Sequence, residues 1–175
     1  MRLGVDFETA SPEVDESAIE GETAQALVLR LAEAKARAVA GNFPNALVIG
    51  SDQVALNGDQ ILGKPGRHDA AVKQLQAASG KTLTFLTGLC LLNTQTGSIH
   101  SHIEPYSVSF RHLREKQIEN YLRREEPYNC AGSFKSEGLG IALFERFQGD
   151  DPNSLIGLPL IQLISMLEAE SFEIL

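Results

Sequence analysis

The 175-residue sequence contains no tryptophan and only two cysteines, Cys90 and Cys130. The two cysteines lie far apart without the short spacing of metal ligands, so we expect free thiols in a reducing compartment. No apolar run approaches the roughly 20 residues of a membrane-spanning helix, and the first residues lack the shape of a signal peptide. These absences favour a soluble, cytoplasmic protein.

Positive charge is also scarce. Lys and Arg number 15 against 23 Asp and Glu, which gives a formal net charge of −8 at pH 7. This balance argues against binding to a nucleic acid polymer or docking on an anionic membrane. The sequence also lacks a Walker loop, a Rossmann fingerprint, a serine nucleophile elbow and a credible Cys–His pair. An acidic protein of this kind can still bind a polyphosphate if it provides local lysines and a divalent cation.

The composition is that of a globular protein, with 43% hydrophobic residues and no repeat, low-complexity tract or linker. We therefore expect one domain that spans residues 1–175. Strand and helix patterns mix along the chain, so the predicted class is α/β with a mixed sheet. Predicted helices cover residues 23–40, 69–78, 115–124 and 159–168, and predicted strands cover residues 82–92, 99–110 and parts of 132–143.

The segment from Leu47 to Pro65 is the centre of the functional prediction. Residues 47–49 form a short apolar run, typical of a strand buried on both faces, which ends just before Asp52. Asn57-Gly58 is a strong signal for a tight hairpin. Lys64 precedes a proline and is biased to an extended conformation. The hairpin can thus bring a lysine back towards an acid, a pairing that suits phosphate chemistry.

Four side chains have two possible interpretations each. Asp52 can bind a metal or accept a proton from water, or it can simply form an Asx turn. Asp15 and Glu16 can ligate Mg²⁺, although a solvated acidic loop is the commoner meaning of such a pair. Lys35 lies on a predicted helix, where most lysines are exposed. Its alanine neighbours would let a strand or ligand approach closely.

The glycine-rich segment 131–140 is the second candidate region. Its glycines can expose backbone to a ligand, while Lys135 offers a positive charge and Glu137 offers acceptors to a base. The alternative is a hairpin with a charged tip. His100 and His102 would share one face of a strand. Because no third ligand is suggested, an exposed surface is favoured over a metal site.

Together these segments are similar to the Maf family in order and spacing, over essentially the whole chain. The resemblance implies a nucleoside-triphosphate pyrophosphatase with the inosine-triphosphatase-like fold, an elongated mixed β-sheet flanked by helices. It also implies hydrolysis of the α–β phosphate link with Mg²⁺ or Mn²⁺, a nucleoside triphosphate as the partner, and a homodimer. The matching segments are Asp15-Glu16, Glu33-Ala34-Lys35-Ala36, Gly50-Ser51-Asp52-Gln53, Leu62-Gly63-Lys64-Pro65, Ser79-Gly80-Lys81, Ala131-Gly132-Ser133-Phe134 and Gly157-Leu158-Pro159-Leu160.

Finer features resemble the YceF-like subgroup of this family, which prefers 7-methyl-GTP. They are Gln53, residues 110–113 and residues 130–138. The resemblance implies that Asp52 accepts the proton and, with Glu16, binds the metal. The residues it implies for substrate binding are Lys35, Lys64, Gln53, Lys135 and Glu137.

The beginning of the sequence departs from the family pattern. Family members start with a strand and Ser-x-Ser-Pro-x-Arg, and Ser11-Pro12 is no substitute because Glu13 follows. We therefore expect either a start codon assigned too far downstream or an N-terminally truncated form with weakened folding and catalysis. A non-catalytic nucleotide-binding or interaction protein is the alternative. A hydrolase for damaged purine triphosphates such as inosine triphosphate is a third possibility, by fold analogy alone.

Overall fold

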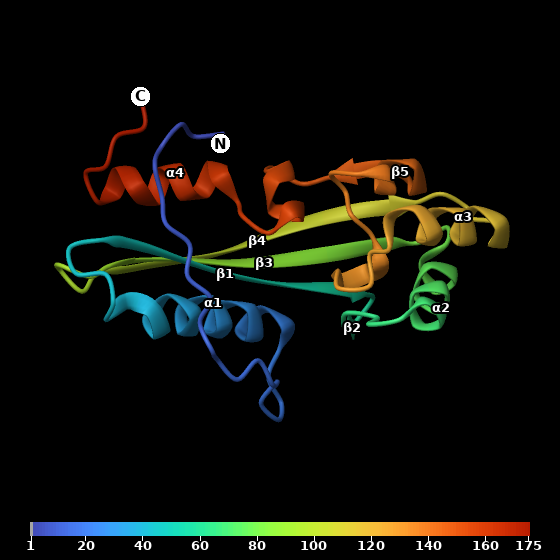
Figure 1. The fold of residues 1–175 in the computed structure, drawn as a ribbon, viewed down its shortest axis with the longest axis horizontal. Helices are drawn as coiled ribbons and strands as arrows, with labels where there is room; N and C mark the ends of the chain where they lie inside the picture. The colour runs from blue at the N-terminus through green and yellow to red at the C-terminus, as the bar shows by residue number, and fades with distance from the viewer. Residues whose placement is uncertain (1) are drawn as a thin grey trace. The chain divides into compact units, whose positions relative to one another are not determined.

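The computed structural model describes residues 2–175 (Figure 1). Helices flank one five-stranded sheet of order β2-β1-β3-β4-β5, which confirms the predicted α/β class. Within residues 2–175, every helix is too short or too polar to span a bilayer. The elements are α1 (Ala24–Ala40), β1 (Leu47–Asn57), β2 (Gln60–Leu62), α2 (His68–Ala78), β3 (Thr82–Asn93), β4 (Ile99–Phe110), α3 (Glu115–Glu125), η1 (Ala131–Ser133), η2 (Leu139–Leu143), β5 (Phe144–Gln148), η3 (Pro152–Ile156) and α4 (Leu160–Ala169).

The tight hairpin predicted at Asn57-Gly58 is confirmed. Strands β1 and β2 are antiparallel, and Asn57 pairs with Gln60. Only Gly58 and Asp59 remain in the turn, and Gly58 has a φ of 61°. A glycine adopts this left-handed conformation without the steric cost of a Cβ atom, which is why the chain reverses here.

The prediction of strands within residues 132–143 is wrong. This segment forms the 3₁₀ turns η1 and η2, and the strand comes later as β5, paired antiparallel with β4. Gly132 and Ser133 have φ values of 75° and 62°. Two successive left-handed residues are incompatible with an extended strand, so the chain coils before β5 begins.

Residues 2–175 divide into two units by the density of their internal contacts. The first unit comprises residues 2–53, 87–104 and 157–175, and the second comprises residues 54–86 and 105–156.

In the first unit, helices cover both faces of the sheet, with α1 on one side and α4 on the other (Figure 1). Successive residues of β3 point to opposite faces, as the pleat of a strand requires. Cys90 packs with Ala32 and Ala36 of α1. Leu91 packs with Leu163 of α4 on the opposite face. Strand β3 is therefore the centre of the first unit.

Strand β1 is longer and less covered than the sequence predicts. It continues through Asp52 to Asn57, so the expectation that the strand ends just before Asp52 is wrong. Val48 is buried beside α1, whereas Ile49, which points to the opposite face, is 42% exposed. The expectation that residues 47–49 are buried on both faces is therefore wrong. The reason is that the apolar residues of α4 pack over Leu89 and Leu91 of β3 and against Leu47 of β1, but leave Ile49 partly exposed.

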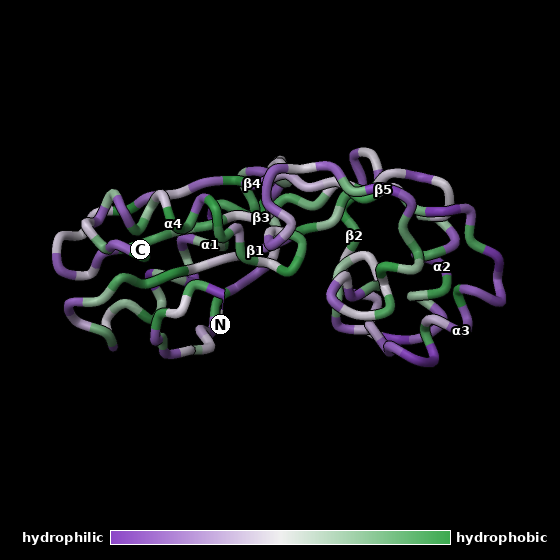
Figure 2. Tube along the Cα trace, turned by 90° about the horizontal axis from the view of Figure 1, so that it is seen from above, coloured by the Kyte–Doolittle hydropathy of each residue, from purple (hydrophilic) through white to green (hydrophobic). Residues whose placement is uncertain are grey.

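In the second unit, an aromatic cluster forms much of the core. The ring centroid of Phe134 lies 4.7 Å from that of Phe144 and 5.3 Å from that of Phe85. Helix α3 packs on this core through Ile118 and Leu122, and the rest of the helix is mainly hydrophilic (Figure 2). Because Phe134 follows Ser133 directly, this core anchors the segment that carries the second group of candidate site residues.

Candidate active site

The first unit brings three predicted site residues into direct contact. The ammonium nitrogen of Lys35 lies 2.6 Å from Oδ1 of Asp52 and 2.7 Å from Oε1 of Glu16. The side chains of Lys35 and Asp52 are only 22% and 12% exposed. An ammonium shared by two carboxylates in a partly dry environment is well suited to exchange one partner for a phosphate oxygen.

Two glycines explain how Lys35 reaches Asp52. A Cβ atom on Gly50 would lie 2.1 Å from the carbonyl oxygen of Ala32, and one on Gly88 would lie 2.2 Å from that of Val28. Helix α1 therefore contacts the backbone of β1 and β3 directly. A lysine one turn along α1 can then reach the carboxylate that follows Gly50 and Ser51.

The charge of Lys35 is stabilised by its surroundings. Burial alone would lower the pKa of Lys35, but hydrogen bonds from its ammonium to Asp52 and Glu16 outweigh burial and raise the pKa above its ordinary value. Lys35 therefore remains cationic at neutral pH. It keeps the two carboxylates close together, where two negative charges alone would repel each other.

Hydrogen bonds hold the residues on either side of Asp52. The hydroxyl of Ser51 lies 2.8 Å from the carbonyl oxygen of Gly88 and 2.7 Å from that of Gly157. The side-chain amide nitrogen of Gln53 donates to Oγ1 of the buried Thr87 at 2.8 Å. These bonds fix the backbone and the side-chain direction of the Gly50–Gln53 segment.

Sequence reasoning missed a pair of residues that fastens the loop carrying Glu16. Two guanidinium nitrogens of Arg30 in α1 donate to the two carboxylate oxygens of Glu22: Nε to Oε1 at 2.6 Å and Nη2 to Oε2 at 2.8 Å. The same guanidinium donates to the carbonyl oxygen of Ser17 at 3.0 Å. This hydrogen bonding lowers the pKa of Glu22 to about 2. The eight-residue spacing of the pair matches no simple helical pattern, so only the bidentate potential of arginine could have suggested it.

The second unit holds the other predicted residues. Lys64 is exposed on the loop of residues 63–66. The amide of Gly66 donates to the carbonyl oxygen of Tyr128 at 2.8 Å, and the side chain of Gln74 donates to that of Gly63 at 2.9 Å. The loop is therefore fixed at both ends, while the lysine between them faces solvent.

Lys135 and Glu137 lie on the segment after Phe134. The backbone amide of Lys135 donates to the hydroxyl of Tyr121, and its ammonium donates to the carbonyl oxygen of Glu125, both at 3.0 Å. Burial raises the pKa of the Cys130 thiol, and the charges of Lys135, Glu137 and Lys64 also act on that pKa. Three predicted residues therefore lie within electrostatic range of one thiol.

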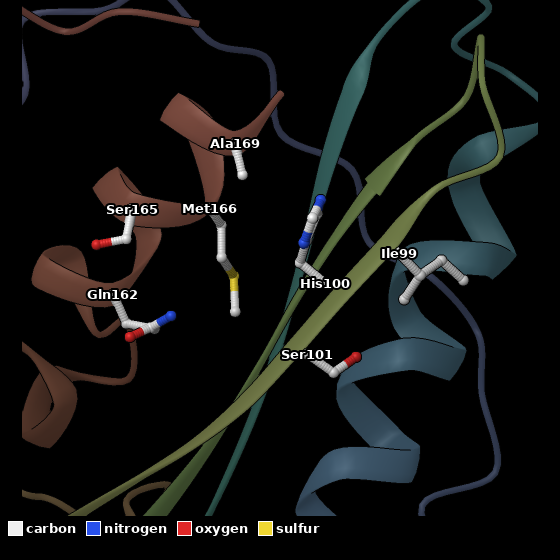
Figure 3. A pocket seen from close by; sticks show the side chains of 7 residues that line it. All are labelled: Ile99, His100, Ser101, Gln162, Ser165, Met166 and Ala169. Carbon is white, nitrogen blue, oxygen red and sulfur yellow. The ribbon is translucent and has the colours of Figure 1, made fainter. Parts of the chain in front are cut away.

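An open pocket in the first unit is separate from these residues. Figure 3 shows it between α4, with Gln162 and Met166, and the start of β4, with His100. Nε2 of His100 donates to the carboxylate of Glu170 at 2.6 Å. Glu170 also accepts hydrogen bonds from Asn93 and Ser98, so it ties the β3–β4 turn to the end of α4. The residues that line this pocket include none of the predicted site residues.

The carboxylates of Glu16 and Asp52 are the donor set nearest to a metal site. Within residues 2–175, no group of three or more histidine, cysteine, aspartate or glutamate side chains is placed to hold a metal ion. Mg²⁺, however, is commonly bound by one or two carboxylates together with substrate phosphates and water. Two hard oxygen donors on either side of one ammonium fit that mode of binding.

Comparisons with known proteins identify the family of this chain. The family model described as Maf-like protein matches residues 1–170. The chain belongs to the Maf family. Relatives named 7-methyl-GTP pyrophosphatase include one from Nitrosococcus oceani, which is 58% identical over 99% of this chain and 87% of its own length. Another, from Alcanivorax borkumensis, is 57% identical over 99% of this chain and 88% of its own length. A third, from Pseudoalteromonas translucida, is 55% identical over 100% of this chain and 87% of its own length. The family resemblance found in the sequence motifs is thereby confirmed.

Proposed function

We propose that this Maf family member hydrolyses 7-methyl-GTP to 7-methyl-GMP and pyrophosphate. The observation that carries the proposal is the contact of the Lys35 ammonium with Glu16 and Asp52. Phosphoryl chemistry needs positive charge against the phosphates and a carboxylate to orient water, and this cluster supplies both. The names of the relatives supply the substrate.

Each side chain of the cluster has a distinct role in this proposal. Asp52 accepts a proton from the attacking water or orients it. Lys35 offsets charge on the phosphates, and Lys64 of the second unit binds phosphate oxygens. Glu16 and Asp52 would hold a divalent cation, Mg²⁺ or Mn²⁺, which supplies further neutralisation of phosphate charge when bound.

Base recognition is proposed for Gln53 and Glu137, and substrate binding through its positive charge for Lys135. Methylation of the guanine ring gives it a positive charge, for which the carboxylate of Glu137 is a suitable partner. Glu137 is exposed and therefore accessible to a ligand.

We further propose that residues 1–175 act as one functional domain, as a homodimer and in the cytoplasm. The free thiols of Cys90 and Cys130 fit a reducing compartment. Sedimentation velocity tests the dimer, because a monomer at micromolar concentration would contradict it.

A substrate panel tests the activity. The chain is incubated with 7-methyl-GTP, GTP, inosine triphosphate, UTP and dTTP in the presence of Mg²⁺ or Mn²⁺, and pyrophosphate release is measured. We expect the highest kcat/KM for 7-methyl-GTP. Binding of 7-methyl-GTP without any product would favour the non-catalytic alternative, and a preference for inosine triphosphate would favour a hydrolase of damaged purines.

A substitution shows whether the identified cluster carries that activity. Asp52→Asn removes the carboxylate, and kcat should fall about 10³-fold, as expected for loss of a general base. Asp59→Asn is the matched control, because Asp59 is an exposed aspartate in the β1–β2 turn. Similar rates for the two variants would contradict the role of Asp52.

A further inference from the structure

A single glutamine side chain in the second unit joins two of the candidate loops. Gln74 lies on α2, and its amide nitrogen donates to the carbonyl oxygen of Gly63 at 2.9 Å. Its amide oxygen accepts a hydrogen bond from the hydroxyl of Ser133 at 2.5 Å. One side chain thus contacts the residue just before Lys64 and a residue two positions before Lys135.

The chemistry of both contacts requires an amide. Gly63 offers a carbonyl oxygen, which needs a donor, and the Ser133 hydroxyl needs an acceptor. Glutamine provides one donor arm and one acceptor arm in a fixed plane. A glutamate would provide two acceptors and an apolar residue neither, so the interaction is specific for the side chain present.

The backbone at Ser133 gives a second, independent observation. Ser133 is fully buried and has a φ of 62°, a conformation that favours glycine. A serine here strains the backbone, and its hydroxyl bond to Gln74 is the compensating interaction that a glycine could not make. The strained turn is thereby fixed to α2.

Both loops carry exposed charged residues that must be held in place by their backbones. Lys64 and Glu137 are exposed, so little side-chain packing restricts them. Their positions therefore depend on how the two loops are anchored.

We propose that Gln74 is a positioning residue, whose amide fixes the Lys64 loop relative to the segment carrying Lys135 and Glu137. The inference rests on the proposed function, in which Lys64 binds phosphate and Glu137 recognises the base. Gln74 thus couples phosphate binding to base selection without touching the substrate.

The test compares Gln74→Leu with Gln76→Leu, which changes an exposed glutamine on the same helix. In Gln74→Leu, the KM for 7-methyl-GTP should rise about tenfold and the preference for 7-methyl-GTP over GTP should fall, with little change in kcat, as expected when ground-state positioning is lost. Gln74→Glu retains the acceptor for Ser133 and loses the donor for Gly63, so it should be intermediate. It also serves if Gln74→Leu fails to fold.

Variants of Ser133 show whether its hydrogen bond to Gln74 positions the two loops for substrate binding or only stabilises the fold. Ser133→Ala removes the hydroxyl but keeps the strain, whereas Ser133→Gly removes both. Ser133→Gly should be more stable than Ser133→Ala, yet both should show the raised KM. Normal KM and selectivity in Ser133→Gly would mean that the bond only braces the fold, which would overturn the inference.

Amide hydrogen exchange provides a readout that does not depend on activity. The amide of Gly66 should exchange faster in Gln74→Leu than in Gln76→Leu, because the loop has lost one anchor. Unchanged exchange together with unchanged KM in Gln74→Leu would overturn the inference about Gln74 and leave the proposed function intact. A wild-type chain that releases no pyrophosphate would instead overturn the proposed function.

Discussion

The two groups of candidate residues are held in place by different forces. In the first unit, Lys35 is fixed by ion pairs to Glu16 and Asp52 and is largely shielded from solvent. In the second unit, Lys64 is exposed, and its loop is held by hydrogen bonds between neutral groups. The first group depends on a balance of charges, and the second depends on loop geometry.

This difference has a direct consequence for substitutions. Removal of one partner from a buried ion pair leaves an uncompensated charge in a poorly solvated place, which destabilises the fold. Removal of an exposed lysine leaves nothing buried behind. Replacing Lys35 in the first unit should therefore lower stability, whereas replacing Lys64 in the second unit should affect only substrate binding.

The largest expected effect comes from Lys35→Met compared with Lys64→Met. Lys35→Met should lower kcat/KM about 10³-fold and reduce the free energy of unfolding by about 1–2 kcal/mol, because Lys35 is only partly buried. Lys64→Met should raise KM about tenfold and change stability by less than about 0.5 kcal/mol. Urea unfolding and steady-state kinetics measure both. Equal losses of stability in the two variants would remove the distinction.

Next in size is the effect of loosening the loop that carries Glu16. Arg30→Lys keeps the charge but loses the bidentate contact with Glu22, so kcat/KM should fall about tenfold. The Mn²⁺ concentration for half-maximal activity should also rise, because Glu16 is less well placed. Arg37→Lys is the control, since Arg37 is an exposed arginine of α1. If Arg30→Lys needs the same Mn²⁺ concentration for half-maximal activity as the wild type, the Arg30–Glu22 ion pair does not position Glu16.

A pH-dependent effect on stability should follow from the same pair. The pKa of Glu22 is lowered from 4.5 to about 2 in the folded chain. The unfolded chain therefore binds a proton first, and the stabilisation present above pH 4.5 is lost as the pH falls towards 2. Glu22→Gln should melt at a lower temperature than the wild type at pH 7, and the difference should shrink by pH 3. A constant difference across this range would contradict the ion pair.

The smallest effect on activity is expected at Glu170. Its hydrogen bonds with Ser98, Asn93 and His100 lower the pKa of Glu170 to about 2. Glu170→Gln should lower the melting temperature above pH 4.5, with the difference shrinking as the pH falls towards 2. Its kcat/KM should stay within about twofold of the wild type. A large loss of activity without unfolding would make the Glu170 region part of the functional site.

Local sequence signals predicted the helices and the tight hairpin well. The predicted helix of residues 23–40 corresponds to α1, with Thr23 as the N-cap residue whose hydroxyl accepts from the amide of Ala26. Such features depend on neighbouring residues alone. The left-handed backbone at Ser133 has no comparable signal, because a serine gives no reason to expect it. Strand β5 was missed for a similar reason, since its FERFQ sequence is short and contains no β-branched residue.

The site was only partly predictable from the residues. Asp52 after a short apolar run and Lys64 before a proline were visible, but Asp52 lies within β1 rather than at its end. The significance of both residues came from the order of the family motifs. The contact of Lys35 with Asp52 depends on α1 approaching β1 at Gly50, a tertiary fact that no local pattern contains. The bidentate Arg30–Glu22 ion pair was missed for the same reason.

The central proposal is that this chain, acting through the cluster around Lys35, hydrolyses 7-methyl-GTP at the bond between the α and β phosphates. The most direct measurement is the product stoichiometry with 7-methyl-GTP as substrate, by chromatography of the nucleotides and a pyrophosphate assay. We predict one 7-methyl-GMP and one pyrophosphate for each 7-methyl-GTP consumed. Release of orthophosphate with 7-methyl-GDP, or the absence of any product, would contradict the account.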